Sequence, residues 1–328
     1  MPCPRLRSSP VPALILVPAL LAAQGTPIIR VEVDLVRVVA TVKNPDGQLT
    51  GALDKPDFRI YDNGREQEIA VFERQTAMPL SVAVMIDTSG STAKELKYET
   101  DSVNRFFRAL FAEGNPEDMV ALYCFNWQVE RLNYFTHNAA PLERSLRGLK
   151  AEAGTSLYDA IFLASEDLEK RQGRRAMVIV TDGGDTTSSK KFHDALEAAQ
   201  LADTIIYPVV VMPITNDAGR NIGGENALTF MAQATGGRTF LPSVGPQLDA
   251  AFSDIIRDLR TQYMIGFYPK DVPLTKNRFH KLEVRVTRPE LRVSARNGYY
   301  GVAEGDFATP GARISVTPES KVKQRQEN

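Results

Sequence analysis

The sequence predicts a doubly wound α/β domain with a mostly parallel sheet, inserted in a small antiparallel β-sandwich that both ends of the chain build. Three observations predict this fold class. Four near-continuous apolar runs lie in the middle of the chain, helical patterns separate them, and the segments on either side alternate apolar and polar residues. Continuous apolar runs suit strands buried on both faces of a parallel sheet, whereas alternation suits strands with one solvated face. Strands that alternate with helices form a doubly wound sheet.

The central segment, residues 79–261, is expected to hold the α/β domain. Its buried strands are expected at residues 80–86, 119–125, 176–180 and 204–211, with an extra strand at 129–132 beside the second. Its helices are expected near residues 96–110, 157–168, 192–201, 227–234 and 246–260. The Gly-rich stretch 219–224 lacks the Lys-Ser/Thr of a phosphate loop, so we interpret it as a flexible segment.

The two flanking segments, residues 28–76 and 262–302, carry the alternating pattern of half-buried strands. Within the first, Asn63 and Gly64 supply the positive φ that a tight hairpin needs. Neither segment is large enough to make a stable core alone, so we expect the two to pair in one β-sandwich. The polar residues 303–328 are expected to form a disordered tail.

The first 25 residues have the pattern of an export signal. Arg5 and Arg7 precede an apolar run at 11–23, and small residues at Ala23 and Gly25 suit a signal peptidase. We therefore predict a signal peptide at 1–25 and a mature protein in the periplasm, on the cell surface or outside the cell. A retained membrane anchor is the alternative, although the run is short for a bilayer span. No other segment is apolar enough to cross a membrane.

Charge and the rare residue types exclude several function classes. The 39 Lys and Arg balance 40 Asp and Glu, which gives no basic excess for nucleic acid. Cleavage of the predicted signal peptide would remove Cys3. Cys124 lies in an apolar run, where we expect it to be a small buried hydrophobic residue. His137, His193 and His280 are scattered, and we expect them on the surface.

Oxygen-bearing side chains cluster where the predicted strands end. Asp87, Ser89 and Ser91 follow the first buried strand, Thr155 precedes a helix, and Asp182 follows the third strand. The carboxyl ends of the strands form the edge where open α/β sheets bind ligands. Hydroxyls with few carboxylates suit Mg²⁺, with Mn²⁺ or Ca²⁺ as alternatives, and the lack of His or thiolate argues against zinc.

Three sequence motifs that carry these residues together resemble the metal-ion-dependent adhesion site of von Willebrand factor A domains. These domains have a Rossmann-like fold. The motifs are Asp87-x-Ser89-x-Ser91, Thr155 in Gly-Thr-Ser-Leu-Tyr-Asp-Ala, and Asp182 in Thr-Asp-Gly. The resemblance implies that both serines bind the metal directly, with Thr155 joining in at least one state. It implies that the two aspartates act largely through bound water, which leaves one position for a carboxylate of a protein partner.

The flanking segments resemble the von Willebrand factor A-related family found in acidobacteria. The matching residues are Asp57-Phe58, residues 61–64, Tyr263 and residues 297–300, so this resemblance covers nearly the whole mature chain. From both resemblances we expect an exported, divalent-metal-dependent binding module of the adhesion type, not an enzyme.

Other interpretations stay open for the same residues. Ser89 and Ser91 could cap the following helix, and Asp159 fits a capping box with Ser156 better than a metal site. Asp185 is expected to form a loop turn. At the level of function, the alternatives are a metal-free structural or interaction protein of this fold and, less favoured, a metal-dependent phosphate-transfer enzyme. Such an enzyme usually needs a second carboxylate two residues after its nucleophile, where this chain has a serine.

Overall fold

The computed structural model describes residues 35–74, 78–112, 114–211, 221–243, 245–272 and 279–301. The predicted signal peptide at 1–25 and the predicted tail at 303–328 lie outside these ranges and stay predictions. Among the described residues, no helix has both the length and the apolar character that a bilayer span requires.

The central domain contains a five-stranded sheet in the order β7-β6-β5-β8-β9. β5, β6, β8 and β9 run parallel, and β7 pairs antiparallel with β6, which confirms the predicted fold class and the extra strand. Every residue of β5 is buried, because this strand lies in the middle of the sheet. The strands are β5 (Leu80–Asp87), β6 (Met119–Phe125), β7 (Val129–Thr136), β8 (Arg174–Thr181) and β9 (Thr204–Val210).

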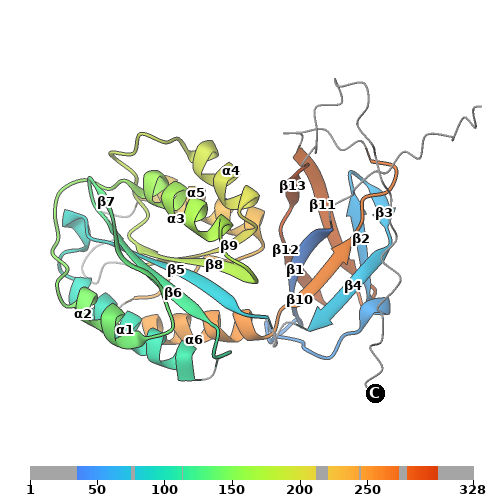
Figure 1. Cartoon of the computed structure of the whole chain (residues 1–328), viewed down its shortest axis with the longest axis horizontal. Coiled ribbons are helices and arrows are strands. Elements are labelled where there is room, and N and C mark those ends of the chain that lie inside the picture. The colour runs from blue at the N-terminus through green and yellow to red at the C-terminus, as the bar shows by residue number, and fades with distance from the viewer. Residues whose placement is uncertain are drawn as a thin grey trace, which may run out of the picture. The chain divides into compact units, whose positions relative to one another are not determined.

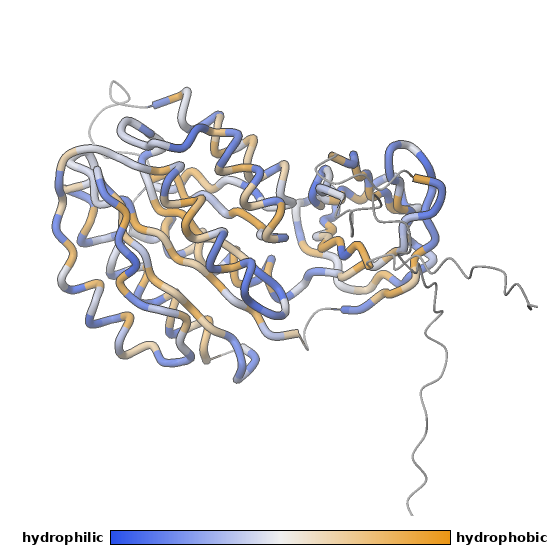
Figure 2. Tube along the Cα trace, turned by 45° about the horizontal axis from the view of Figure 1, so that its top comes forward, coloured by the Kyte–Doolittle hydropathy of each residue, from blue (hydrophilic) through white to orange (hydrophobic). Residues whose placement is uncertain are grey.

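Helices cover both faces of this sheet (Figure 1). One apolar core joins the sheet to α1, α2 and α6, and a second joins its other face to α3, α4 and α5. Figure 2 shows hydrophobic residues along the central strands and hydrophilic ones on the outer turns of the helices. The helices are α1 (Leu96–Ala112), α2 (Ala139–Leu146), α3 (Leu157–Glu169), α4 (Phe192–Leu201), α5 (Ile222–Thr235) and α6 (Pro246–Arg260).

The flanking segments form two antiparallel four-stranded sheets, β12-β1-β10-β4 and β13-β11-β2-β3. β1 lies between β10 and β12, and β2 pairs with β11, so strands from before and after the central domain share both sheets, as expected. One apolar core contains residues of both sheets. The strands are β1 (Val36–Lys43), β2 (Phe58–Asp62), β3 (Arg65–Gln67), β4 (Ile69–Arg74), β10 (Tyr263–Phe267), β11 (Phe279–Val286), β12 (Arg292–Ala295) and β13 (Gly298–Tyr300).

The interpretation of residues 219–224 as a flexible segment is wrong for residues 222–224, whereas residues 219 and 220 lie outside the described ranges. α5 begins at Ile222, so Gly223 and Gly224 are helical. A Cβ on Gly224 would lie 1.4 Å from the carbonyl oxygen of Gly183. The glycine is therefore required because the first turn of α5 packs directly against the loop that follows β8.

Candidate functional site

The loop after β5 is organised by the buried carboxylate of Asp87. Its Oδ1 accepts a hydrogen bond from the backbone N–H of Ser89 at 2.8 Å, and its Oδ2 accepts one from the Thr181 hydroxyl at 2.6 Å. Burial raises the pKa of Asp87 to about 6; these hydrogen bonds oppose the shift, and the charge of Asp182 adds to it. Asp87 thus fastens the loop to the end of β8 and uses both of its oxygens to do so.

The hydroxyls of Ser89 and Ser91 lie 2.9 Å apart. Two oxygens that bind one Mg²⁺ at right angles, each at about 2.1 Å, lie about 3 Å from each other. Ser89 precedes the short helical turn η3 (Gly90–Thr92) but makes no side-chain capping bond. Instead, the hydroxyl of Thr92 donates to the carbonyls of Asp87 and Ser89 at 3.0 and 3.1 Å. The capping alternative for the two serines is therefore not supported.

Thr155 lies on the neighbouring loop that leads into α3. Its N–H donates to the Thr186 hydroxyl at 3.0 Å, and its carbonyl accepts from the N–H of Thr186 at 2.8 Å. Its own hydroxyl makes no hydrogen bond within the described ranges. Glu152, three residues earlier, donates its N–H to the Thr88 carbonyl and forms an isolated parallel bridge with Ser89. The loop that carries Thr155 is thereby held beside the serines.

Asp182 follows β8 directly and is partly exposed. Its Oδ1 accepts a long hydrogen bond, 3.4 Å, from the N–H of Gly184. Because β5 and β8 are parallel neighbours that pair Ile86 with Val180, Asp87 and Asp182 leave the same edge of the sheet. The structure thus places all five expected residues at or just beyond this edge of the sheet, and it links Asp87 and the two serines by direct hydrogen bonds.

A buried acid that the sequence motif does not include, Glu99, lies in the first turn of α1, the helix that follows the loop of Ser89 and Ser91. Its side chain is completely buried, and neither carboxylate oxygen has a hydrogen-bond partner among the described residues. Burial raises the pKa of Glu99 well above its ordinary value, and the charges of Asp87, Glu95 and Asp182 raise it further. The sequence pattern could have identified Glu99 as a buried acid, because position 99 lies three residues after Leu96, on the apolar face of the helix.

The residues present fit a hard divalent cation. Ser89 and Ser91 offer two adjacent hydroxyls, and Thr155 offers a third that has no partner within the described ranges. Asp87 and Asp182 supply carboxylates, and oxygen donors of this kind suit Mg²⁺. Within the described ranges, no three His, Cys, Asp or Glu side chains are placed to hold a metal by themselves. A cation at this edge would therefore depend on the hydroxyls, with carboxylates acting through water.

Two acidic residues near this edge have roles in the loops. The carboxylate of Asp159 accepts from the N–H groups of Ser189 and Lys190 at 2.9 and 2.7 Å, while Ser156 makes no capping bond, so the capping-box interpretation is wrong. Asp185 accepts from the Ser188 hydroxyl at 2.5 Å, which confirms the expected loop turn.

An exposed aromatic residue also lies beside the site. Trp127, in the loop between β6 and β7, is 53% exposed, and its indole N–H donates to the Glu152 carboxylate at 3.1 Å. Its backbone N–H donates to the carbonyl of Ala153 at 3.2 Å. Trp127 therefore belongs to the same group of loops as Thr155, and its ring also borders an open hollow.

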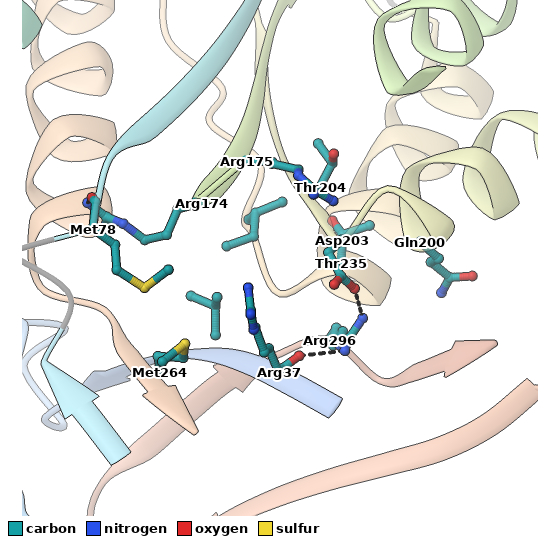
Figure 3. Close-up of a pocket in the computed structure, with 13 residues that line it drawn as sticks. Arg37, Met78, Arg174, Arg175, Gln200, Asp203, Thr204, Thr235, Met264 and Arg296 are labelled. Carbon is teal, nitrogen blue, oxygen red and sulfur yellow. Dashed lines mark hydrogen bonds and ion pairs between the residues drawn. The ribbon is translucent and has the colours of Figure 1, made fainter. Parts of the chain in front are cut away.

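A cavity of about 60 Å³ is lined by residues at the opposite ends of the strands, including Arg174 and Arg175 at the start of β8 (Figure 3). Its arginines are used by the protein itself. Arg296 binds the Asp203 carboxylate and the Arg37 carbonyl, while Arg174 and Arg175 donate to backbone carbonyls. We interpret this cavity as a structural contact between β8 and the strands of the flanking segments.

The fold and the hydroxyl-rich edge define a class of protein: a doubly wound α/β domain with a candidate cation site at the carboxyl ends of its strands. The family model of the von Willebrand factor type A domain matches residues 82–184, which include all five expected site residues. The chain therefore contains a von Willebrand factor type A domain. A search of curated proteins found no match.

Solved structures similar to this chain include two bacterial proteins. The conserved hypothetical protein BatB from Bacteroides thetaiotaomicron is 17% identical and has a TM-score of 0.45; the match covers 55% of this chain and 97% of that one. The vWF domain of the type V pili tip protein Mfa5 from Porphyromonas gingivalis is 16% identical and has a TM-score of 0.46; the match covers 56% and 95%.

Proposed function

We propose that this chain is an exported protein-binding module of the adhesion type, which captures an acidic group of a partner through a bound Mg²⁺. The observation that carries the proposal is the pair of Ser89 and Ser91 hydroxyls, 2.9 Å apart. The bridge between Ser89 and Glu152 ties their loop to the one that carries Thr155. When bound, the cation supplies an electrophilic position for a carboxylate oxygen. A neutral hydroxyl ligand leaves more of the metal's charge for that oxygen than a carboxylate ligand would.

The aspartates position the site. Asp87 holds the serine loop to β8 through Thr181, and Asp182 offers a carboxylate to water at the edge of the site. Ser91 is exposed, so a partner can approach the hydroxyl pair from solvent. The exposed ring of Trp127 supplies apolar contact area close by, and such aromatic residues are typical of the energetically dominant part of an interface.

The geometry disfavours the phosphate-transfer alternative. A nucleophilic aspartate needs an oxygen free to attack, whereas both oxygens of Asp87 accept hydrogen bonds, from Ser89 and from Thr181. The second carboxylate that such chemistry requires is absent at position 89, which is a serine. A binding module needs neither feature.

Calorimetry on the mature chain tests the metal site directly. We expect the wild type to bind Mg²⁺ and Mn²⁺, and Ser89→Ala to bind them more weakly while it stays folded, since Ser89 lies in a loop above the sheet core. Asp182→Ala is expected to lower the affinity on the order of 10–100-fold, as the loss of a group that orients bound ligands does. Ser253→Ala, on the exposed side of α6, is the matched control and should change nothing.

Partner capture tests the function that the metal serves. Proteins from the host's cell envelope are passed over the immobilised mature chain with Mg²⁺ and with a chelator. We expect specific capture that the chelator abolishes. If the folded wild type takes up no divalent ion at millimolar concentration, or if captured proteins are indifferent to the chelator, the structural alternative replaces this proposal.

Export is the part of the proposal that rests on the sequence alone. Mass spectrometry of the protein secreted by its host should give an N-terminus near Thr26. Soluble protein that retains Met1 would contradict it.

A further inference from the structure

The buried carboxylate of Glu99 has no partner within the part of the chain that the structure describes. Its carboxylate is 0% exposed, and neither oxygen accepts a hydrogen bond from a described residue. Buried carboxylates are normally paired with a cation or with several donors, because removing a charge from water is unfavourable. The first turn of α1 offers the partial positive charge of a helix N-terminus, but such a field weakens within a turn and supplies no bond to these oxygens.

A chain of hydrogen bonds connects Glu99 with the loop after β5. The Glu99 N–H donates to the Glu95 carbonyl, and the Glu95 N–H donates to the carbonyl of Thr92. The hydroxyl of Thr92 in turn donates to the carbonyls of Asp87 and Ser89.

Asp87, Glu95 and Asp182 are all acidic, and each makes the ionised form of Glu99 less favourable. Two of these three belong to the candidate metal site. A positive charge placed between the loops after β5 and β8 would therefore reduce the repulsion among the carboxylates of Glu99, Asp87 and Asp182.

We propose that Glu99 is a third carboxylate of the cation site, which would act on a bound cation through water. This inference rests on the proposed metal site and goes beyond its five expected residues. Glu99 acts through water, because it does not form a three-membered acidic cluster able to hold a metal directly with Asp87 and Asp182. Its role is to raise affinity for the cation and to couple metal binding to the stability of the fold.

A plain structural role for Glu99 predicts a different behaviour. A buried, protonated glutamate is nearly isosteric with glutamine, so Glu99→Gln would then leave both metal affinity and metal-dependent stability unchanged. If Glu99 is the third carboxylate, the same substitution removes a charge that attracts the cation. The two roles therefore differ in how the variant responds to Mg²⁺, not in whether it folds.

The experiment compares four mature chains: wild type, Glu99→Gln, Glu95→Gln and Asp182→Ala. Each is freed of metal, then titrated with MgCl₂ by calorimetry and unfolded thermally with and without Mg²⁺. We expect Glu99→Gln to bind Mg²⁺ on the order of 10-fold more weakly, with a smaller Mg²⁺-dependent rise in Tm. Glu95, in the turn before α1 and only partly buried, is the matched control; its substitution should leave both quantities near the wild-type values.

The outcomes separate this inference from the proposed function. If Asp182→Ala loses affinity but Glu99→Gln does not, the metal site stands and the role of Glu99 is overturned. If the folded wild type binds no Mg²⁺, the proposed function fails, and this inference fails with it. Should Glu99→Gln not fold, Glu99→Met replaces it, because methionine has a similar length and suits an apolar helix face; undiminished Mg²⁺ affinity in that variant would equally overturn the inference.

Discussion

Two buried acidic residues of this chain have opposite environments. In the β-sandwich, Asp62 accepts a hydrogen bond from the Tyr299 hydroxyl at 2.7 Å, and its other oxygen lies 3.0 Å from Nδ1 of His280. In the α/β domain, Glu99 is equally buried but has no such partner among the described residues. A buried acid with its own hydrogen-bond donors stabilises the fold, whereas a buried acid without donors indicates a place where a further group binds.

The Asp62 cluster also explains how the two flanking segments hold together. Its three residues lie on β2, β11 and β13, so one polar network joins the segment before the central domain to the segment after it. Within the described residues, Nε2 of His280 is the one nitrogen of this cluster without a partner. The expectation that His280 lies on the surface is wrong, because the ring is completely buried between sheet residues.

The largest expected effect is therefore on the sandwich. Asp62→Ala should lower the free energy of unfolding by about 3–5 kcal/mol, because it leaves His280 and Tyr299 buried without their partner. Urea unfolding measures this loss, and Mg²⁺ should not restore it. Glu66→Ala is the control: its ion pair with Arg59 is exposed, so about 1 kcal/mol or less is expected. Similar losses in the two variants would show that the Asp62 network does not support the fold.

The sequence predicted the central sheet well because local patterns determine it. Continuous apolar runs located β5, β6, β8 and β9, since strands buried on both faces need apolar residues at every position. The same reasoning missed α2, which has only eight residues and buries only Leu142 and Leu146. Two buried leucines are too few to reveal the 3.6-residue repeat by which a helix is recognised in a sequence.

The polar clusters were harder to predict because they depend on long-range contacts. Nothing near His280 in the sequence indicates that Asp62, more than 200 residues earlier, lies beside it. Glu99 was overlooked for a different reason: an acid in the first turn of a helix is ordinary, and only its place on the apolar face distinguishes it. Asp87 and its companion residues could be named in advance because the three pieces of a known motif occur in order.

The pH dependence of the metal-free protein sharpens the contrast between the two regions. The pKa of Asp87 is about 6 in the folded chain, above its ordinary value of 3.8, so the folded state binds a proton more tightly than the unfolded state. Stability conferred by that proton is present below pH 4 and is lost as the pH rises through 6. We expect the metal-free protein to lose about 1 kcal/mol between pH 5 and pH 7 from this group.

Chemical unfolding in the presence of a chelator measures this difference. Asp87→Asn should remove the part of this pH dependence that comes from Asp87, because an amide does not titrate. Mg²⁺ should offset the loss of stability at pH 7 by taking the place of the proton. An acid stabilised by a salt bridge would make the protein more stable as the pH rises, which is the opposite of the change expected here. If the metal-free protein gains stability between pH 5 and pH 7 and Asp87→Asn removes that gain, the raised pKa of Asp87 is contradicted.

The smallest effect on the protein itself is expected from Trp127→Ala. Trp127 is 53% exposed, so the removal of its ring should change the free energy of unfolding by only about 0.5 kcal/mol. Mg²⁺ affinity should also stay unchanged, since the indole N–H donates to Glu152, which is not an expected ligand. Metal-dependent capture of an envelope partner should nevertheless fall, because an exposed aromatic residue beside the metal supplies contact area that Mg²⁺ does not. Tyr134→Ala, equally aromatic and 71% exposed but farther along β7, is the control. Equal capture by the two variants would restrict recognition to the cation and the loops that hold it.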